Sequence, residues 1–226
     1  MSPRKKRPPK VRPEDPHGVD AAWRVFLAVP MPPEARDAAA GVVERLRPLD
    51  WPMRWTAPES MHLTLHFLGE QPRERVELLR LALPQVIARH EAFALRTGNL
   101  GVFPTVRRPR VLWLGLHGPA HRLEALQAEL GAALRELEFP VEAEAFHPHV
   151  TLGRVRNQGT PTVPLRDLPE TMKRELADPA TGVMAGPPVA AVPVERVELV
   201  RSFLSHEGSR YETIAVFPLA RPESEG

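Results

Sequence analysis

Two short phrases of this sequence carry the same pair of polar side chains. HLTLHFLG begins at His62, HPHVTLGR begins at His147, and both contain His-x-Thr-Leu. The shared pairs are His62 with Thr64 and His149 with Thr151, so the paired histidines are 87 residues apart. An imidazole can give or take a proton near neutral pH, and a threonine hydroxyl can donate a hydrogen bond to an oxygen anion. The repeated phrase therefore indicates one acid–base site built from two segments.

The first phrase has the alternation of a half-buried β-strand, because successive side chains on a strand point to opposite faces. His62, Thr64 and His66 share the predicted polar face. The leucines between them share the other face with Phe67, so we expect Phe67 to point into the core. His66 lies outside the shared motif, where it is either a contact at the edge of a substrate or a solvated side chain.

The second phrase predicts a strand at about His149 to Val155 with the same alternation. If the two strands lie side by side, one histidine can act as general base while the other acts as general acid. Arg154, three residues after Thr151, adds a guanidinium that can bind phosphate through two parallel hydrogen bonds. His147 is expected at the rim of the cleft. This set of groups suits in-line attack on a phosphodiester without a metal ion.

A zinc site is the main competing interpretation. His62 and His66 would share a face of a helix, but on a strand they are about 13 Å apart, too far for one ion. His147 and His149 are spaced better for chelation, yet only Glu70 adjoins either phrase as a further ligand, and the chain has no cysteine. A single His-x-Thr also occurs by chance in cores. Two copies on two expected strands favour catalysis.

Composition bounds the remaining possibilities. The 226 residues carry a net charge of +2, and the six cations before Glu14 leave −4 for the rest. A partner nucleic acid is therefore expected to be held by an end, or as a small fragment, and not along a long backbone. Residues 1–20 form a predicted disordered basic tail, either solubilising or a non-specific RNA tether. The absence of cysteine fits a cytoplasmic protein, and no apolar run approaches the ~20 residues of a membrane span.

The order of expected elements predicts an α+β fold with mostly antiparallel sheets and outer helices. Residues 21–226 are expected to form a single bilobal domain, with a Pro-rich loop at about 157–193 that contains one short helix near 169–176. Pro84 should kink or split its helix. The expected strands cover residues 23–30, 62–69, 93–103, 110–116, 149–155 and a closing hairpin from 194 to 219, and the expected helices cover 33–46, 73–90 and 119–137.

The two phrases resemble those of the 2H phosphoesterase superfamily, named for its paired His-x-Thr/Ser motifs. Within it the match is to RNA 2′,3′-cyclic phosphodiesterases, first described as 2′-5′ RNA ligases. That group shows His-x-Thr-Leu-x-Phe-Leu-Gly, as at His62 to Gly69, and Pro-His-x-Thr-Leu-Ala/Gly-Arg, as at Pro148 to Arg154. The resemblance covers roughly residues 23–154 and 194–219. The basic tail and the Pro-rich stretch depart from it.

The resemblance implies a two-lobed fold with the active-site cleft between the lobes. It implies that water attacks a terminal RNA 2′,3′-cyclic phosphate, that the 3′ oxygen leaves, and that a 2′-phosphate remains, with 2′-5′ ligation as the reverse reaction. His62 would be the general acid and His149 the general base, and Thr64, Thr151 and Arg154 would hold the phosphate. No metal or other cofactor is implied, and we expect a monomer.

Two other interpretations stay open at this point. The substrate can be another cyclic or 2′-5′ phosphodiester, including a cyclic nucleotide or an ADP-ribose cyclic phosphate. Alternatively, the chain is an RNA-end binding module without significant turnover. Five aromatic residues could stack on bases or simply pack in the core. They are Phe26, Trp55, Phe103, Phe203 and Tyr211.

Overall fold

A computed structural model describes residues 22–105, 108–156, 189–204 and 209–221. Within these ranges, three α-helices and two short 3₁₀ helices accompany nine strands. The helices are α1 (Pro33–Leu46), α2 (Arg73–Ile87), α3 (Ala120–Glu136), η1 (Arg47–Leu49) and η2 (Pro58–Ser60). The strands are β1 (Trp23–Pro30), β2 (Met53–Trp55), β3 (His62–Gln71), β4 (Phe93–Thr105), β5 (Arg108–His117), β6 (His149–Val155), β7 (Ala191–Val194), β8 (Arg196–Leu204) and β9 (Ser209–Pro218).

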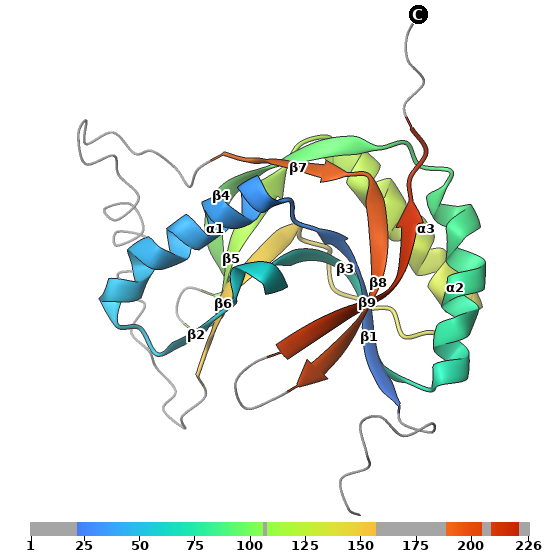
Figure 1. Ribbon diagram of the computed structural model, residues 1–226, viewed down its shortest axis with the longest axis horizontal. Helices are drawn as coiled ribbons and strands as arrows, with labels where there is room; N and C mark the ends of the chain where they lie inside the picture. Colours follow the sequence, from blue (N-terminus) through green and yellow to red (C-terminus); the bar gives the residue numbers. More distant parts are fainter. Residues whose placement is uncertain (1–21, 106–107, 157–188, 205–208, 222–226) are drawn as a thin grey trace, which may run out of the picture.

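The strands form one curled, antiparallel sheet in the order β7-β4-β5-β6-β3-β1-β8-β9, with β2 off this path and paired to β6 (Figure 1). The sheet divides into two lobes between β6 and β3. We call β3-β1-β8-β9 the His62 half and β7-β4-β5-β6 the His149 half. The predicted α+β, two-lobed fold is confirmed.

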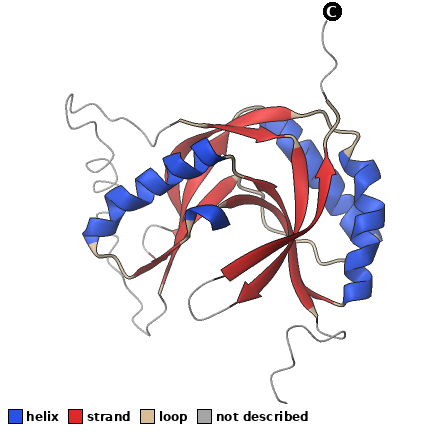
Figure 2. Cartoon of the chain, viewed as in Figure 1, coloured by secondary structure: helices blue, strands red, loops and turns tan. Residues whose placement is uncertain are grey.

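The helices cover the outside of the sheet (Figure 2). Helices α2 and α3 pack against each other beside the His62 half, whereas α1 contacts β6 and β7 of the His149 half. Each helix buries one apolar stripe at spacings of three and four, which is why it forms where the sequence predicts. Pro84 lies inside α2, which continues to Ile87, so the helix is not split there. In the described residues, no helix is long and apolar enough to span a membrane.

A β-bulge in β3 reverses the strand's alternation directly after the first motif. Thr64 pairs with Ala28 and His66 pairs with Leu27, so one extra residue lies between them. A bulge turns the residues beyond it to the other face. His66 is consequently 3% exposed on the core face, while Phe67 is 42% exposed on the face of Thr64. The predictions that Phe67 points into the core and that His66 lies at a substrate or in solvent are both wrong.

The second motif strand has its bulge at the equivalent position. Thr151 pairs with Trp113 and Gly153 pairs with Leu112 across β5, which leaves Leu152 as the extra residue. Strict alternation would place Arg154 on the face opposite Thr151, because the two are three residues apart. The bulge brings Arg154 back to the face of Thr151. Arg154 follows His149 by the same number of residues as Phe67 follows His62, so the two occupy equivalent positions in the two motif strands.

Two strands were not anticipated from the sequence. Strand β2 is only three residues long, and β7 uses the last residues of the Pro-rich stretch, from Ala191 onward. Residues 157–188 of that stretch lie outside the described residues, together with the short helix expected near 169–176 and residues 1–20 of the basic tail. The expected closing hairpin forms from β8 and β9, whose connection is also outside them.

Candidate active site

The two motif strands meet at one backbone pair, Leu63 with Val150. Both residues are fully buried, so they form the core side of the junction. In an antiparallel ladder, the residue before Leu63 lies opposite the residue after Val150, and the residue after Leu63 lies opposite the residue before Val150. His62 lies across from Thr151, and Thr64 lies across from His149, on the face opposite the buried pair.

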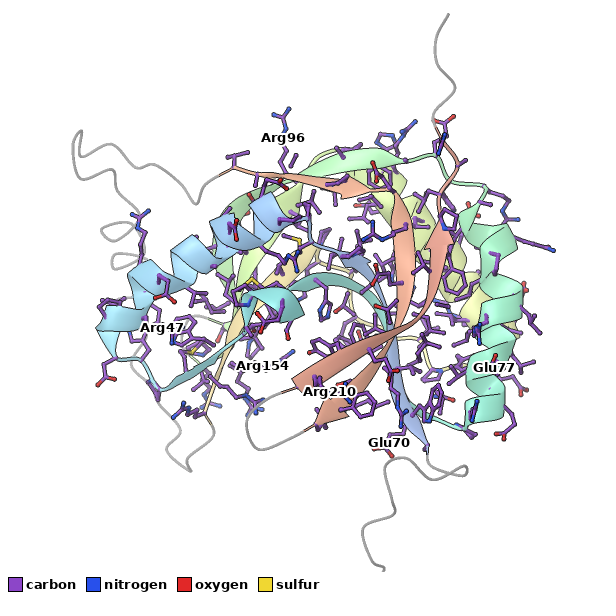
Figure 3. All side chains as sticks on the ribbon, viewed as in Figure 1. Arg47, Glu70, Glu77, Arg96, Arg154 and Arg210 are labelled. Atoms are coloured by element: carbon purple, nitrogen blue, oxygen red, sulfur yellow. The ribbon has the colours of Figure 1, made fainter. Side chains whose placement is uncertain are left out.

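A cleft of about 540 Å³ opens over this junction and collects all five predicted site residues. The hairpin β8–β9 forms one wall and the region of β2 and β6 forms the other, with Arg154 extending between them (Figure 3). The lining residues are Arg24, Val25, Phe26, Arg54, Thr56, Ser60, His62, Thr64, Phe67, Gly69, Glu142, His149, Thr151, Arg154, Ser202, Leu204, Ser209 and Tyr211.

Each motif histidine is held by the carbonyl two residues before it. Nδ1 of His62 lies 2.8 Å from the carbonyl oxygen of Ser60, and Nδ1 of His149 lies 2.6 Å from that of His147. Because a carbonyl oxygen only accepts, Nδ1 must carry the hydrogen in both rings. When neutral, each imidazole therefore keeps an unprotonated Nε2 available on the cleft side.

Aromatic rings enclose the His62 imidazole. Phe26 stacks on it with centroids 4.7 Å apart, and Tyr211 meets it edge-on at 5.2 Å. This burial lowers the pKa of His62 from 6.5 to about 4, opposed by the hydrogen bond to Ser60 and assisted by the positive charges of His149 and Arg154. His62 is therefore neutral at pH 7.

His149 has a matching but distinct surround. The ring of Phe103 approaches it edge-on at 5.0 Å, and Trp113 lies at 6.2 Å. Burial lowers the pKa of His149, opposed by the hydrogen bond to His147, while Arg154 and His147 lower it further. Phe26, Tyr211 and Phe103 therefore contact the motif histidines. Trp55 packs against the core, and Phe203 contacts Arg201 and Arg210 instead of lining the cleft.

The charge of the cleft is dominated by guanidinium groups. Among the described residues, Arg24, Arg54 and Arg154 line it together with one carboxylate, Glu142. Burial, followed by repulsion from Glu144, raises the pKa of Glu142. Such a cleft suits an anion flanked by two imidazoles and hydroxyl donors.

His66 belongs to the core instead of the cleft. Its Nε2–H donates to the carbonyl oxygen of Gln127 on α3 at 2.8 Å, and burial lowers its pKa. A Cβ at Gly131 would lie 3.2 Å from Cε1 of His66, so the small residue gives the ring room. Since His62 and His66 lie on opposite faces of the sheet, they cannot bind one zinc ion together. Within the described residues, no group of three or more His, Asp or Glu is placed to hold a metal.

Sequence reasoning missed Phe67, Arg54 and Glu142 as residues of the cleft. Phe67 has a fixed place in the first phrase, yet only the bulge reveals its face. Arg54 precedes an aromatic residue in a short segment with no period to analyse. Glu142 lies between α3 and β6 without regular structure.

Comparisons with known proteins agree with this geometry. The family model described as LigT-like phosphoesterase matches residues 29–113 and 115–211. A relative from Aeropyrum pernix named RNA 2′,3′-cyclic phosphodiesterase is 33% identical over 165 residues, 72% of this chain and 84% of the relative. A relative of the same name from Thermus thermophilus is 34% identical over 203 residues, 87% of this chain and 90% of the relative.

Solved structures show the same fold. The protein TT0787 of Thermus thermophilus has a TM-score of 0.69 at 28% identity, over 88% of this chain and 100% of that one. LigT of E. coli in its apo form has a TM-score of 0.66 at 24% identity, over 89% and 99% of the two chains. The family match includes both motif strands and most of the described residues, so this chain belongs to the LigT-like phosphoesterase family.

Proposed function

We propose that this protein hydrolyses the 2′,3′-cyclic phosphate at the end of an RNA to a 2′-phosphate. The observation that carries the proposal is the crossed arrangement of His62, Thr64, His149 and Thr151 around one strand junction. The curated relatives named RNA 2′,3′-cyclic phosphodiesterase support the same substrate.

Arg154 and the two threonine hydroxyls are proposed to hold the non-bridging phosphate oxygens. His149 takes a proton from water through Nε2 while the water oxygen attacks phosphorus. The bond from phosphorus to the 3′ oxygen breaks, and His62 donates a proton to that oxygen, leaving a 3′-hydroxyl and a 2′-phosphate. His62 gains this proton as the anionic phosphate arrives, because a nearby negative charge raises the pKa of an imidazole. Running the steps backward would give 2′-5′ ligation.

The proposal includes a metal-independent reaction by a monomer in the cytoplasm. Two imidazoles supply both proton transfers, and Arg154 with the hydroxyls supplies the electrostatic stabilisation. No step in this scheme asks for a Lewis acid. The experiment below therefore contains a chelator, and sedimentation would report the oligomeric state.

An oligoribonucleotide with a 2′,3′-cyclic phosphate end tests the reaction. In EDTA the product should carry a 2′-phosphate, and His62→Ala or His149→Ala should each lower kcat/KM about 10²–10⁴-fold. His121→Ala is the matched control, because His121 is exposed at the start of α3. Undiminished hydrolysis in both active-site variants would overturn the proposal. Tight binding with turnover at background would favour the RNA-end binding module instead.

A further inference from the structure

Strand β2 places a second arginine directly beside Arg154. Its three residues pair with β6, and Arg54 stands opposite Arg154 in the register. Side chains opposite each other on antiparallel strands have Cβ atoms about 4.5–5.5 Å apart. Within the described residues, no ion pair joins either guanidinium to a carboxylate.

The packing under β2 holds Arg54 in this place. Met53 is 4% exposed and Trp55 packs against the same core, so Arg54 between them must face the other way. Gly153 allows the close approach, because a Cβ there would lie 3.0 Å from both Met53 Cε and Trp55 Cε3. The pairing of two cations is thus built into the strand contact and is not an accident of flexible side chains.

Like charges directly opposite each other destabilise a strand pair unless an anion lies between them. A side pocket of about 150 Å³ adjoins the cleft at this point, and both arginines are among its lining residues. Its other lining residues include four hydroxyl donors: Thr56, Ser60, Ser209 and Tyr211. No carboxylate is among the described residues that line it. The chemistry of the pocket is that of a site for a phosphate group.

We propose that Arg54 forms a second anion subsite, which binds the phosphodiester immediately upstream of the reacting terminal phosphate. The inference rests on the proposed function. Arg154 lowers the pKa of both motif histidines through its charge, so it stands near the reacting phosphate. Strand β2 pairs with the same edge of β6 as β3, so Arg54 lies four residues along β6 from the Leu63–Val150 junction, where the next phosphate of a single strand would follow. The subsite selects the end of an RNA chain over a free cyclic mononucleotide.

The test compares three substrates that share the cyclic end. One is a nucleoside 2′,3′-cyclic phosphate, one is a dinucleotide with that end, and one is the same dinucleotide with a neutral methylphosphonate linkage. Wild-type kcat/KM should be about tenfold or more higher for the charged dinucleotide than for the other two, since hydrogen bonds to charged groups are worth at least that factor.

Replacing the arginine should remove this preference. In Arg54→Gln, the ratio of kcat/KM between charged and neutral dinucleotides should fall to about one, as a double-mutant cycle requires for a direct contact. Arg54→Lys should keep part of the ratio, because it keeps the charge but loses the fork of donors. Arg96→Gln is the control, since this exposed arginine on β4 lines neither the cleft nor the side pocket (Figure 3).

The outcomes separate this inference from the proposed function. Equal ratios in wild type and Arg54→Gln, with hydrolysis of all three substrates, would overturn the subsite and keep the cyclic phosphodiesterase. An equal loss on every substrate would assign Arg54 to the reacting phosphate and overturn the subsite as well. A cyclic mononucleotide that also carries a 5′-phosphate tests whether the subsite needs only the anion or an RNA chain. If its kcat/KM matches that of the charged dinucleotide, any phosphate at that position suffices, and selection for a chain is overturned.

Discussion

The aromatic enclosure of His62 predicts that opening it will change the protonation of that residue. We consider Tyr211→Ala, which removes the ring that meets the imidazole edge-on at 5.2 Å and leaves Phe26 stacked on its face. Tyr211 lies at the wall of the cleft, so water can take the place of its ring. Hydration favours the charged imidazolium, so the pKa of His62 should rise.

The size of the expected rise follows from how far the pKa of His62 is lowered in the wild-type protein. A pKa of about 4 against 6.5 corresponds to about 3 kcal/mol in favour of the neutral ring. Tyr211 provides one of the two rings that enclose the imidazole, and burial is the largest cause of the shift. Removing it should return about a third to a half of this energy, which raises the pKa by about one.

The assay is an NMR titration of ¹⁵N-histidine-labelled protein, which follows Nε2 and Nδ1 of each ring between about pH 3.5 and 8. Tyr211→Phe is the matched control, because it keeps the ring and removes only the hydroxyl. His66 provides an internal reference, since its surround near Gln127 is not touched by the substitution. If the pKa of His62 in Tyr211→Ala stays at the wild-type value, the enclosure by Tyr211 does not cause the depression and the reasoning is refuted.

Three further predictions concern the titrating groups. The pKa values of His62 and His149 lie below 6.5 in the free enzyme, so the proposed acid loses its proton as the pH rises and kcat/KM should fall above about pH 6.5. In the complex the substrate phosphate raises the pKa of the acid, so kcat should hold to higher pH. A kcat/KM that is independent of pH from 5 to 8 would contradict this. Between about pH 6.5 and pH 4, His62 is protonated in the unfolded chain but neutral in the folded chain. The free energy of unfolding should therefore fall as the pH is lowered across this window. Denaturant titrations at pH 7 and pH 4 should show that the free energy of unfolding changes by about 3 kcal/mol less in His62→Gln than in wild type. An equal change in the two proteins would contradict the assignment. His66→Leu should cost about 0.5–1.5 kcal/mol, because it removes the buried hydrogen bond to the Gln127 carbonyl, and this should appear as a lower Tm with kcat/KM unchanged. Loss of activity without loss of stability would return His66 to the cleft.

Much of the site was predictable because it lies on two strands whose sequences alternate between apolar and polar residues around the motif positions. The phrases around His62 and His149 each show apolar residues on one face, so the motif side chains had to share the other. The three long helices were predictable for a similar reason, since each has an apolar stripe with a 3.6-residue period.

The errors begin at the bulges, where the period of two fails. Nothing local in HLTLHFLG marks the extra residue at Leu65, because its position is decided by pairing with β1 across the sheet. The same event in β6 explains why Arg154, at an odd spacing from Thr151, still reaches the cleft. Strand β2 was missed because three residues carry no period, and its pairing depends on the space above Gly153.

The junction at Leu63 and Val150 has a mechanical consequence. Each lobe contributes one imidazole, and the rest of each lobe is tied together by longer ladders than the one between them. The seam between the two lobes therefore lies directly beneath the two imidazoles. Rotation of one lobe against the other would change the distance between the proposed proton acceptor and the proposed proton donor, so the proposed mechanism requires a rigid seam.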